Sequence, residues 1–145
     1  MPMVHPCTIS LEVTGTQANI NTVKSAAEGA TFFETLSPIN SADPDVAIEN
    51  WGTPYDTGGL TVTENATDPN AVVITMDFTL DYSPPITILA AIEALDCEVF
   101  CTYYNATLGY AGVYSFGMDR AYHTFDDAFY LLPDGILLAN KYSLS

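Results

Sequence analysis

The spacing of apolar residues changes several times along this chain, and the order of these changes constrains its fold more than any other feature. In residues 8–14, apolar and polar side chains alternate, which is the pattern of a half-buried strand. Residues 18–28 and 86–95 instead carry apolar side chains three and four positions apart, as amphipathic helices do. Further strands are predicted at residues 60–64, 72–81, 99–104 and 110–116. The predicted order is strand, helix, strand, strand, helix, strand, with additional segments.

Residues that begin and end helices and turns mark the boundaries of these elements. Thr16 precedes the first helix as a cap and Gly29 follows it, whereas SPP at residues 83–85 opens the second helix. The triplet DPN at residues 68–70 predicts the turn of an antiparallel hairpin. Turn-forming residues at 40–45 predict an irregular insertion after the first helix.

This order is the split pattern of a ferredoxin-like β-α-β sandwich, so we predict an α+β fold with an antiparallel sheet. A chain of 145 residues suits a single domain, residues 1–145, that buries roughly 68–70% of its unfolded surface. The ferredoxin-like core is predicted at about residues 8–117. Residues 118–145 form a C-terminal extension, in which PDG at 133–135 interrupts an apolar tail.

Acidic residues outnumber basic residues by a wide margin. Eighteen Asp and Glu face only Lys24, Arg120 and Lys141, which gives a formal net charge of −15, although 48% of the residues are hydrophobic. A disordered acidic tail lacks the apolar residues that offset chain entropy, so this composition indicates a folded domain with a negative surface. Such a surface repels nucleic acid and anionic membranes and attracts proteins with a basic working surface. Direct nucleic-acid binding is disfavoured, because it needs Lys or Arg to neutralise phosphates.

The sequence favours a soluble protein without a cofactor, metal ion or disulfide. No stretch approaches the roughly 20 apolar residues of a membrane span, and residues 1–6 lack the basic and apolar regions of a leader. Cys7, Cys97 and Cys101 show no repeated CxxC spacing, so we expect three thiols rather than a zinc site. We expect the protein to be made in the cytosol.

Several short segments occur in the order found in a known family. They are LEVTG at residues 11–15, FETLSP at 33–38, NWGTPYD at 50–56, YSPP at 82–85, and Tyr103 with YAG at 110–112. Together they resemble the YubB-like family of plasmid- and phage-encoded proteins, whose domain is ferredoxin-like. The resemblance covers about residues 8–117 and implies this fold and a mobile-element origin, but no established reaction. Relatives favour Lys and Trp after the Trp-Gly-Thr triplet, where this chain has Pro54 and Tyr55.

The motifs of common enzyme classes do not occur in the sequence. It has no Walker loop, dinucleotide fingerprint or Gly-x-Ser-x-Gly elbow, so we predict that the protein is not an enzyme and assign no catalytic residue. Asp43 with Asp45 is a candidate site for a hard cation, and Asp126 with Asp127 is a candidate neighbour of His123. No calcium-loop spacing supports either site, and a histidine in such an aromatic stretch is more often a packing or surface residue.

A run of tyrosines has two interpretations. The first is a half-buried sheet face, and the second is an interface patch, because Tyr supplies amphipathic contact area at a low entropic cost. We favour the first interpretation. The residues are Tyr103, Tyr104, Tyr110, Tyr114 and Tyr122.

The remaining functional class is an inhibitor that occupies a basic groove of another protein. Acids such as Asp77 with Asp81 on a strand, or Glu93 with Asp96 on a helix, would address the Lys and Arg stripe of a nucleic-acid-binding groove. We predict an anti-CRISPR type of phage or mobile-element inhibitor that acts in the host cytoplasm on a CRISPR effector or restriction enzyme, with DNA mimicry as one way of doing so. The candidate partner-binding acids are Asp43, Asp45, Glu49, Asp56, Glu64, Asp77, Asp81, Glu93, Asp96, Asp126 and Asp127. The candidate aromatic anchors are Trp51 and Tyr55.

The alternative is a virion, assembly or other interaction protein whose acidic surface only keeps it soluble. Under this hypothesis binding is hydrophobic and insensitive to salt. The apolar residues 136–139 are then a candidate homodimer seam.

Overall fold

The computed structural model describes residues 5–66, 68 and 70–144, and within these residues the chain forms six strands, five α-helices and a 3-10 helix. The strands are β1 Pro6–Gly15, β2 Thr63–Ala66, β3 Val72–Asp81, β4 Glu98–Asn105, β5 Tyr110–Ser115 and β6 Met118–His123. The helices are α1 Gln17–Glu28, α2 Phe32–Leu36, α3 Pro44–Trp51, α4 Ile86–Glu93, the 3-10 helix η1 Asp127–Leu131 and α5 Pro133–Tyr142. None of these helices has the length and apolar character that crossing a bilayer requires.

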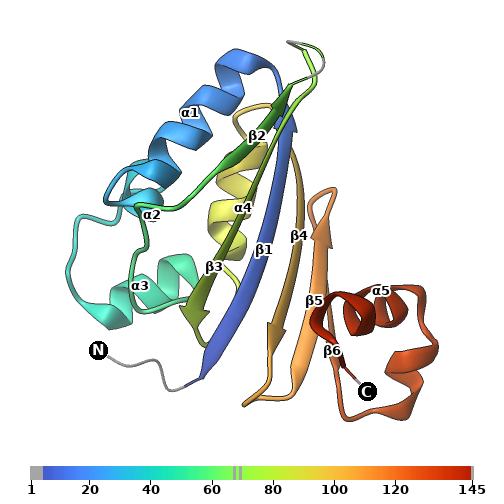
Figure 1. The fold of residues 1–145 in the computed structure, drawn as a ribbon. Helices are drawn as coiled ribbons and strands as arrows, with labels where there is room; N and C mark the ends of the chain where they lie inside the picture. The colour runs from blue at the N-terminus through green and yellow to red at the C-terminus, as the bar shows by residue number, and fades with distance from the viewer. Residues whose placement is uncertain (1–4, 67, 69, 145) are drawn as a thin grey trace.

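All the strands belong to one antiparallel sheet, in the order β2-β3-β1-β4-β5-β6 (Figure 1). The first four strands have the ferredoxin-like arrangement, in which α1 connects β1 to β2 across β3, and α4 connects β3 to β4 across β1. The predicted α+β fold class is therefore confirmed. Strands β5 and β6 extend the sheet beyond this core.

Two helices cover one face of the core strands, and Figure 1 looks onto the opposite face. Helix α1 buries Ile20 and Val23, and helix α4 buries Ile88 and Leu89, in the same hydrophobic cluster as the alternate residues of β1 and β3. The Thr16 hydroxyl accepts a hydrogen bond from the Asn19 N–H at 3.3 Å and caps α1, as predicted. Both predicted helices are present.

The insertion after α1 is present, but it is not wholly irregular, because it contains helices α2 and α3. Neither helix was predicted from the sequence. The Asp43 carboxylate accepts a hydrogen bond from the Asp45 N–H at 2.9 Å, and Pro44 occupies the first turn of α3. These are ordinary signals for the start of a helix, which the turn-forming neighbours obscured.

The predicted hairpin of β2 and β3 is present with a shifted first strand. Strand β2 begins three residues later than predicted, at Thr63, and pairs antiparallel with β3. Asp68 accepts hydrogen bonds from the N–H groups of Asn70 and Ala71, so a turn forms here, and Pro69 lies outside the described residues.

The C-terminal extension adds strand β6 and then folds back over the sheet. Helices η1 and α5 lie on the face opposite α1 and α4, over β5 and β6. Phe129 of η1 and Leu138 of α5 are buried there with Ala111 and Val113 of β5, in a cluster separate from the main core. On the same face of β3, β1 and the start of β4, Asp77, Glu12 and Glu98 stay exposed, and Lys141 of α5 lines a hollow with Glu12.

Candidate functional site

The predicted partner-binding acids lie on several different elements. Those that remain exposed are Asp43, Asp45 and Glu49 at α3, Glu64 on β2, Asp77 on β3, Asp96 after α4, and Asp126 with Asp127 at η1. They do not form one cluster, because α3, β2 and η1 are far apart in the fold. A single partner surface could therefore contact only some of the predicted partner-binding acids.

Asp81 is not available to a partner, which corrects the prediction for this residue. Its side chain is buried with 6% of the residue exposed, and its carboxylate accepts a hydrogen bond from the His5 N–H at 2.9 Å. Asp77 and Asp81 do share one face of β3, as predicted, but only Asp77 is exposed. The hydrogen bond from His5 replaces part of the hydration that this carboxylate loses on burial.

The half-buried carboxylates of Asp56 and Glu93 also serve the fold. Asp56 accepts hydrogen bonds from the N–H groups of Phe33 and Glu34 and so caps α2. Glu93 accepts the hydroxyl proton of Tyr114 and the N–H of Gly117, at 3.0 Å for the latter, and so joins α4 to the β5–β6 hairpin. Both carboxylates thus have internal roles, and the prediction that they face a partner stays a prediction.

Trp51 is a core residue, so the prediction that it anchors a partner is wrong. Only 4% of the residue is exposed, its indole N–H donates to the Ser37 carbonyl at 2.9 Å, and its ring lies edge-on to Phe33. Helix α2, which was not predicted from the sequence, supplies this packing through Phe33. Tyr55 is 42% exposed and remains a candidate contact residue.

Three carboxylates form a diagonal line across the sheet face opposite α1 and α4. Ser10 of β1 is opposite Asp77 of β3, and Thr14 of β1 is opposite Glu98 of β4. Along β1, Asp77 is therefore level with the position two residues before Glu12, and Glu98 is level with the position two residues after it. Such diagonal neighbours are about 7–8 Å apart. We call Asp77, Glu12 and Glu98 the acidic row.

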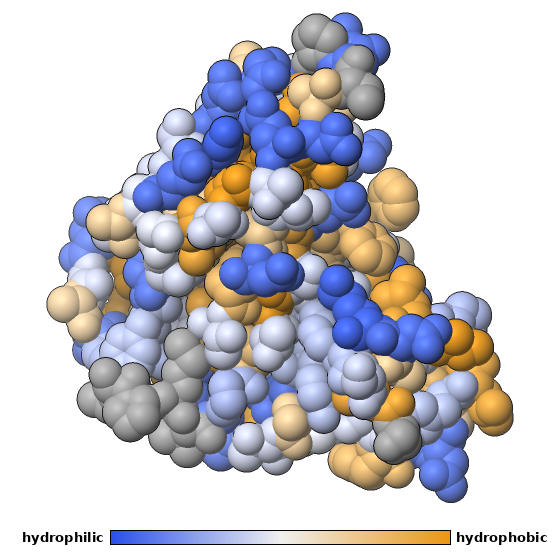
Figure 2. All heavy atoms as spheres, viewed as in Figure 1, coloured by the Kyte–Doolittle hydropathy of each residue, from blue (hydrophilic) through white to orange (hydrophobic). Residues whose placement is uncertain are grey.

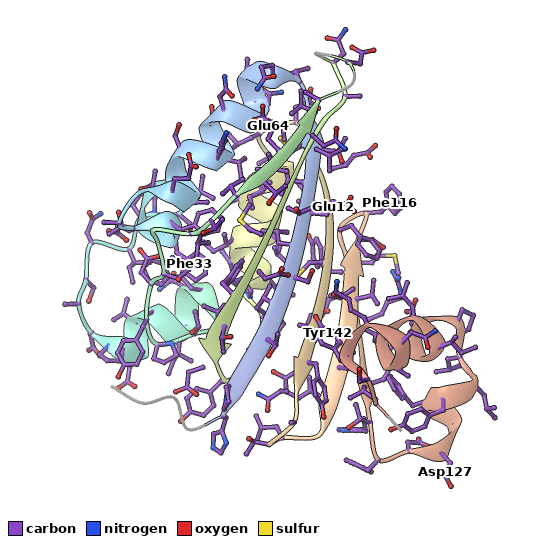
Figure 3. The ribbon with its side chains drawn as sticks, viewed as in Figure 1. Glu12, Phe33, Glu64, Phe116, Asp127 and Tyr142 are labelled. Carbon is purple, nitrogen blue, oxygen red and sulfur yellow. The ribbon has the colours of Figure 1, made fainter. Side chains whose placement is uncertain are left out.

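The acidic row is exposed, and sequence reasoning found only one of its members. All three side chains are exposed, and Figure 3 shows Glu12 on the open side of the sheet. Glu12 and Glu98 were missed because each is a single acid within its own strand. Only the pairing register of β3, β1 and β4 brings them together, and the sequence carries no direct signal for that register.

Aromatic side chains lie beside the acidic row. Phe100 is 38% exposed and is opposite Glu12 in the pairing of β4 with β1. Phe116, at the tip of the β5–β6 hairpin, is 84% exposed, and it lines a hollow of about 190 Å³ together with Glu12, Glu98 and Phe100. Figure 3 shows Phe116 projecting away from the sheet.

The backbone at the hairpin tip is unusual. Phe116 has a φ of 51° and Gly117 a φ of 73°, so two successive residues adopt the left-handed conformation of a tight hairpin turn. Asn or Gly normally occupies the first of these positions, since a bulky side chain is strained there. Met118, which follows, is 61% exposed.

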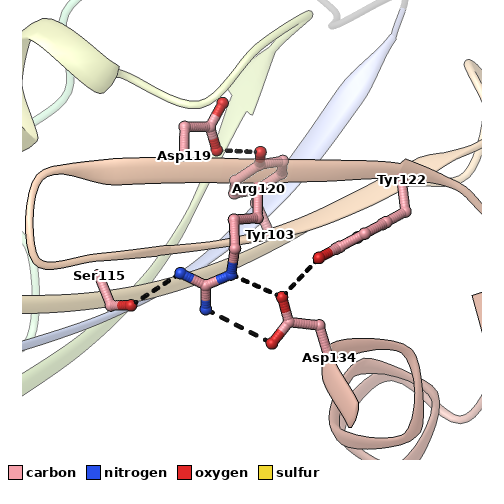
Figure 4. Close-up of polar contacts among 6 residues, drawn as sticks. All are labelled: Tyr103, Ser115, Asp119, Arg120, Tyr122 and Asp134. Carbon is pink, nitrogen blue, oxygen red and sulfur yellow. Dashed lines mark hydrogen bonds and ion pairs between the residues drawn. The ribbon is translucent and has the colours of Figure 1, made fainter. Parts of the chain in front are cut away.

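The few basic side chains neutralise little of the surface. Among the described residues two ion pairs occur, Lys24 with Glu64 at 3.6 Å and Arg120 with Asp134 at 2.7 Å. Figure 4 shows that Asp134 also accepts a hydrogen bond from the Tyr122 hydroxyl, at 2.7 Å. The hydrogen bond from Arg120 lowers the pKa of Asp134. Most of the eighteen acids therefore keep an uncompensated charge.

The tyrosine run is mainly a packing feature, as the favoured interpretation predicted. Tyr103 and Tyr114 are buried on the side of the sheet that α4 covers, and Tyr104 and Tyr122 pack under the extension on the other side. Burial, followed by a hydrogen bond to a carboxylate, raises the pKa of Tyr103 and of Tyr114 well above the ordinary value.

The structure adds no support to the candidate cation site at Asp43 and Asp45 or to a site of Asp126 and Asp127 with His123. Asp43 is occupied in capping α3, and Asp126 caps η1 by accepting the Ala128 N–H at 3.0 Å. The His123 ring stacks on Phe125 at a centroid distance of 4.9 Å. Within the described ranges, no group of three or more His, Cys, Asp or Glu residues is arranged to hold a metal ion.

No family model and no curated protein matches the chain. A solved structure with some similarity is that of the protein api92 from Yersinia pseudotuberculosis, which carries the family label DUF1281. The superposition has a TM-score of 0.40 at 17% sequence identity and covers 61% of this chain and 33% of that chain. The chain thus spans about a third of the length of api92, and a likeness this slight carries no inference about function.

Proposed function

We propose that this protein is an inhibitor, encoded by a phage or other mobile element, that binds the basic nucleic-acid-binding groove of a host defence enzyme of the CRISPR or restriction type. The observation that carries the proposal is the acidic row, which presents three exposed carboxylates at regular spacing on the sheet face opposite α1 and α4, where Lys141 of α5 lines a hollow with Glu12. Lys and Arg arranged to neutralise successive phosphates are the natural counterpart of such a row. The proposed role is binding, with no catalytic step.

Charge alone accelerates and orients the encounter with a partner but does not give tight binding. An exposed ion pair contributes about 0.2–1 kcal/mol, so three pairs add at most a few kcal/mol. The net charge of −15 extends this effect, because a strong field of one sign raises the rate of encounter with a basic groove. The acidic row therefore needs an apolar contact beside it.

Phe116 supplies that contact. It lines the same hollow as Glu12 and Glu98, and the hairpin holds it in solvent despite the strained backbone. Aromatic residues that enter a partner's pocket commonly dominate the energy of an interface. The carboxylates that would attract a basic groove and the aromatic side chain that would enter a pocket of the partner therefore lie side by side on one surface. The resemblance to phage and plasmid proteins supports the proposed origin, and action in the host cytoplasm follows from the proposed target.

The test is a pull-down from nuclease-treated lysate of a host that carries CRISPR and restriction systems. We expect a nucleic-acid-binding effector that is released between about 50 and 500 mM salt and displaced by DNA. The triple variant Glu12→Gln, Asp77→Asn, Glu98→Gln is expected to lose this effector. A control triple, Asp45→Asn, Glu49→Gln, Asp127→Asn, removes the same charge elsewhere and is expected to retain it. Equal loss in both triples would reject the row as the binding surface.

A second candidate function rests on exposed apolar residues of the extension. Leu131 is 81% exposed, Ile136 52% and Leu137 41%, and Figure 2 shows hydrophobic residues gathered at the right-hand edge, over α5. These residues suit the alternative of an assembly role through a homodimer or a neighbouring protein. Sedimentation at rising protein concentration distinguishes the assembly role from the inhibitor function, because self-association through this apolar surface should persist in high salt.

A further inference from the structure

A second concave site lies on the opposite side of the sheet from the acidic row. It is a hollow of about 410 Å³, within the range of small-ligand pockets. Ser83, Pro84 and Ile86, at the start of α4, form one wall. The other walls come from β4, β5 and β6, on the side of the sheet that α4 only partly covers.

A close approach of two strands shapes the floor of this hollow. Gly112 of β5 is opposite Tyr103 of β4, and the absence of a side chain at Gly112 lets the Tyr103 ring lie across the β5 backbone. The Tyr103 hydroxyl thereby reaches β6, where it donates a hydrogen bond to Oδ1 of Asp119 (Figure 4). The second oxygen, Oδ2, accepts no hydrogen bond from the residues that the structure describes, and Asp119 lines the hollow.

The charge in this hollow is uncompensated. Asp119 is the one acidic residue in the lining and His123 is the one basic residue, and among the described residues no ion pair joins the two. Arg120 is adjacent in sequence but points to the other face of the sheet, where it is held by Asp134 at 2.7 Å. The strand alternation therefore separates the carboxylate from the nearest guanidinium.

The other lining residues suit a ligand that has a short apolar chain with a positively charged group at its end. Pro84, Ile86 and Ala121 offer apolar contacts, and the Tyr110 ring is fixed because its hydroxyl donates to the Tyr82 carbonyl. Aromatic faces attract cations, and a carboxylate held by a tyrosine hydroxyl is already oriented for one. An anionic ligand would instead meet the Asp119 charge and the field of the whole protein.

We propose that this hollow binds an organic cation, an alkylammonium or guanidinium group on a short apolar stem, with Asp119 as its counter-ion. The cation has two sources, a free amine or guanidine and the Lys or Arg side chain of a protein. The proposal does not depend on the inhibitor function, because the hollow and the acidic row lie on opposite faces of the sheet.

The test is a titration followed by amide NMR shifts, with four cationic probes and one neutral probe. N-acetyl-arginine amide and N-acetyl-lysine amide represent protein side chains, agmatine and butylamine represent free cations, and N-acetyl-norleucine amide is the neutral control. We expect saturable shifts at Asp119, Ala121 and Tyr110 with the cations alone. Tighter binding of the capped amino acids than of agmatine and butylamine assigns the site to protein side chains, and the reverse order assigns it to free cations.

Two variants separate charge from shape. Asp119→Asn keeps an acceptor for the Tyr103 hydroxyl and is expected to weaken binding about tenfold, which corresponds to about 1.4 kcal/mol. Ala121→Leu keeps the charge and fills the hollow, and it is expected to abolish the shifts. Asp127→Asn removes one charge from η1 and is expected to leave binding unchanged; circular dichroism checks the fold of each variant.

Three results would overturn the proposal. They are equal shifts with the neutral probe, affinity that survives Asp119→Asn, and shifts confined to the acidic row. The last result would leave the inhibitor function standing, whereas failure of the unmodified protein to capture any effector in the pull-down would leave the cation site standing.

Discussion

Tyr103 and Gly112 approach so closely across neighbouring strands that a Cβ atom on Gly112 would lie 2.2 Å from the Tyr103 hydroxyl oxygen. The ring therefore occupies the space that any other residue at position 112 would need. This contact fixes both the packing of β4 against β5 and the reach of Tyr103 to Asp119 on β6.

Replacing Gly112 by Ala is expected to destabilise the fold. The added methyl group must displace a buried ring, and overpacking of this kind costs about 1–3 kcal/mol. The free energy of unfolding in urea measures the loss. In a Tyr103→Ala background the same Gly112→Ala change is expected to cost far less, since the ring is gone; an equal cost in both backgrounds would contradict the clash.

Replacing Phe116 by Asn is expected to stabilise the protein and weaken its binding to a target. Phe116 has a φ of 51°, and the left-handed conformation costs most residues about 1–2 kcal/mol, whereas Asn tolerates it. We expect a gain of roughly 0.5–1 kcal/mol in urea unfolding, together with loss of the effector in the pull-down. Phe125→Asn, at a residue that is 75% exposed on the extension, is the control and should leave capture unchanged. Retention of the effector by the Phe116 variant would remove Phe116 as the anchor.

Neutralising one member of the acidic row is expected to raise stability slightly. Glu98 is a diagonal neighbour of the like-charged Glu12 and has no ion pair among the described residues, so Glu98→Gln should add a few tenths of a kcal/mol at low salt. Glu64→Gln is the matched control, because it removes the ion pair with Lys24 and should not stabilise. Thermal unfolding in low and high salt measures both changes, and the gain from Glu98→Gln should shrink as salt rises.

High pH is expected to unfold the protein through its buried tyrosines. Burial raises the pKa of Tyr142 to about 12, and it also raises the pKa of Tyr103, Tyr110 and Tyr114. A folded-state pKa above the unfolded value of about 10 means that stability is full below about pH 10 and falls as pH rises beyond it, because the unfolded chain releases these protons first. Tyrosinate absorbance of the native protein should lag behind that of the urea-unfolded protein. Coincident titration curves would contradict this expectation.

The three cysteines are expected to resist thiol reagents until the protein unfolds. All three are free and buried, and burial raises the pKa of Cys7 to about 11 and also raises the pKa of Cys97 and Cys101. The thiolate is the reactive form, so labelling by a disulfide reagent at about pH 8 should be slow in the native state and complete in urea. Cys97 is 8% exposed and should react first. Rapid labelling of Cys7 would be inconsistent with this packing.

Elements whose ends are marked by residues within the segment itself, such as caps and alternating apolar residues, were predicted from the sequence. Strand β3 has the predicted limits, and α1 begins after the predicted cap at Thr16. Strand β6 was missed because it is an edge strand of mostly polar residues, whose alternation becomes visible only when it pairs with β5. Helix α3 was missed because its start signal lies among turn-forming residues.

The sequence predicted that the candidate site is acidic, but it did not predict which acidic residues form it. An excess of carboxylates is visible in the sequence, but which of them are exposed together depends on strand register and on the helices of the insertion. Asp81 is buried by its place at the end of β3, and Trp51 is buried by the packing of Phe33 from α2. Glu12 and Glu98 become neighbours only through the pairing of β1 with β4. These are non-local contacts, which no spacing within a strand reveals.

The two covering layers of the sheet are offset from one another. Helices α1 and α4 cover β3, β1 and β4 on one side, and the extension covers β5 and β6 on the other. The uncovered areas therefore face in opposite directions and share no side chain. A molecule bound to one area would therefore leave the other area accessible, so the proposed effector and the proposed cation could be bound at the same time.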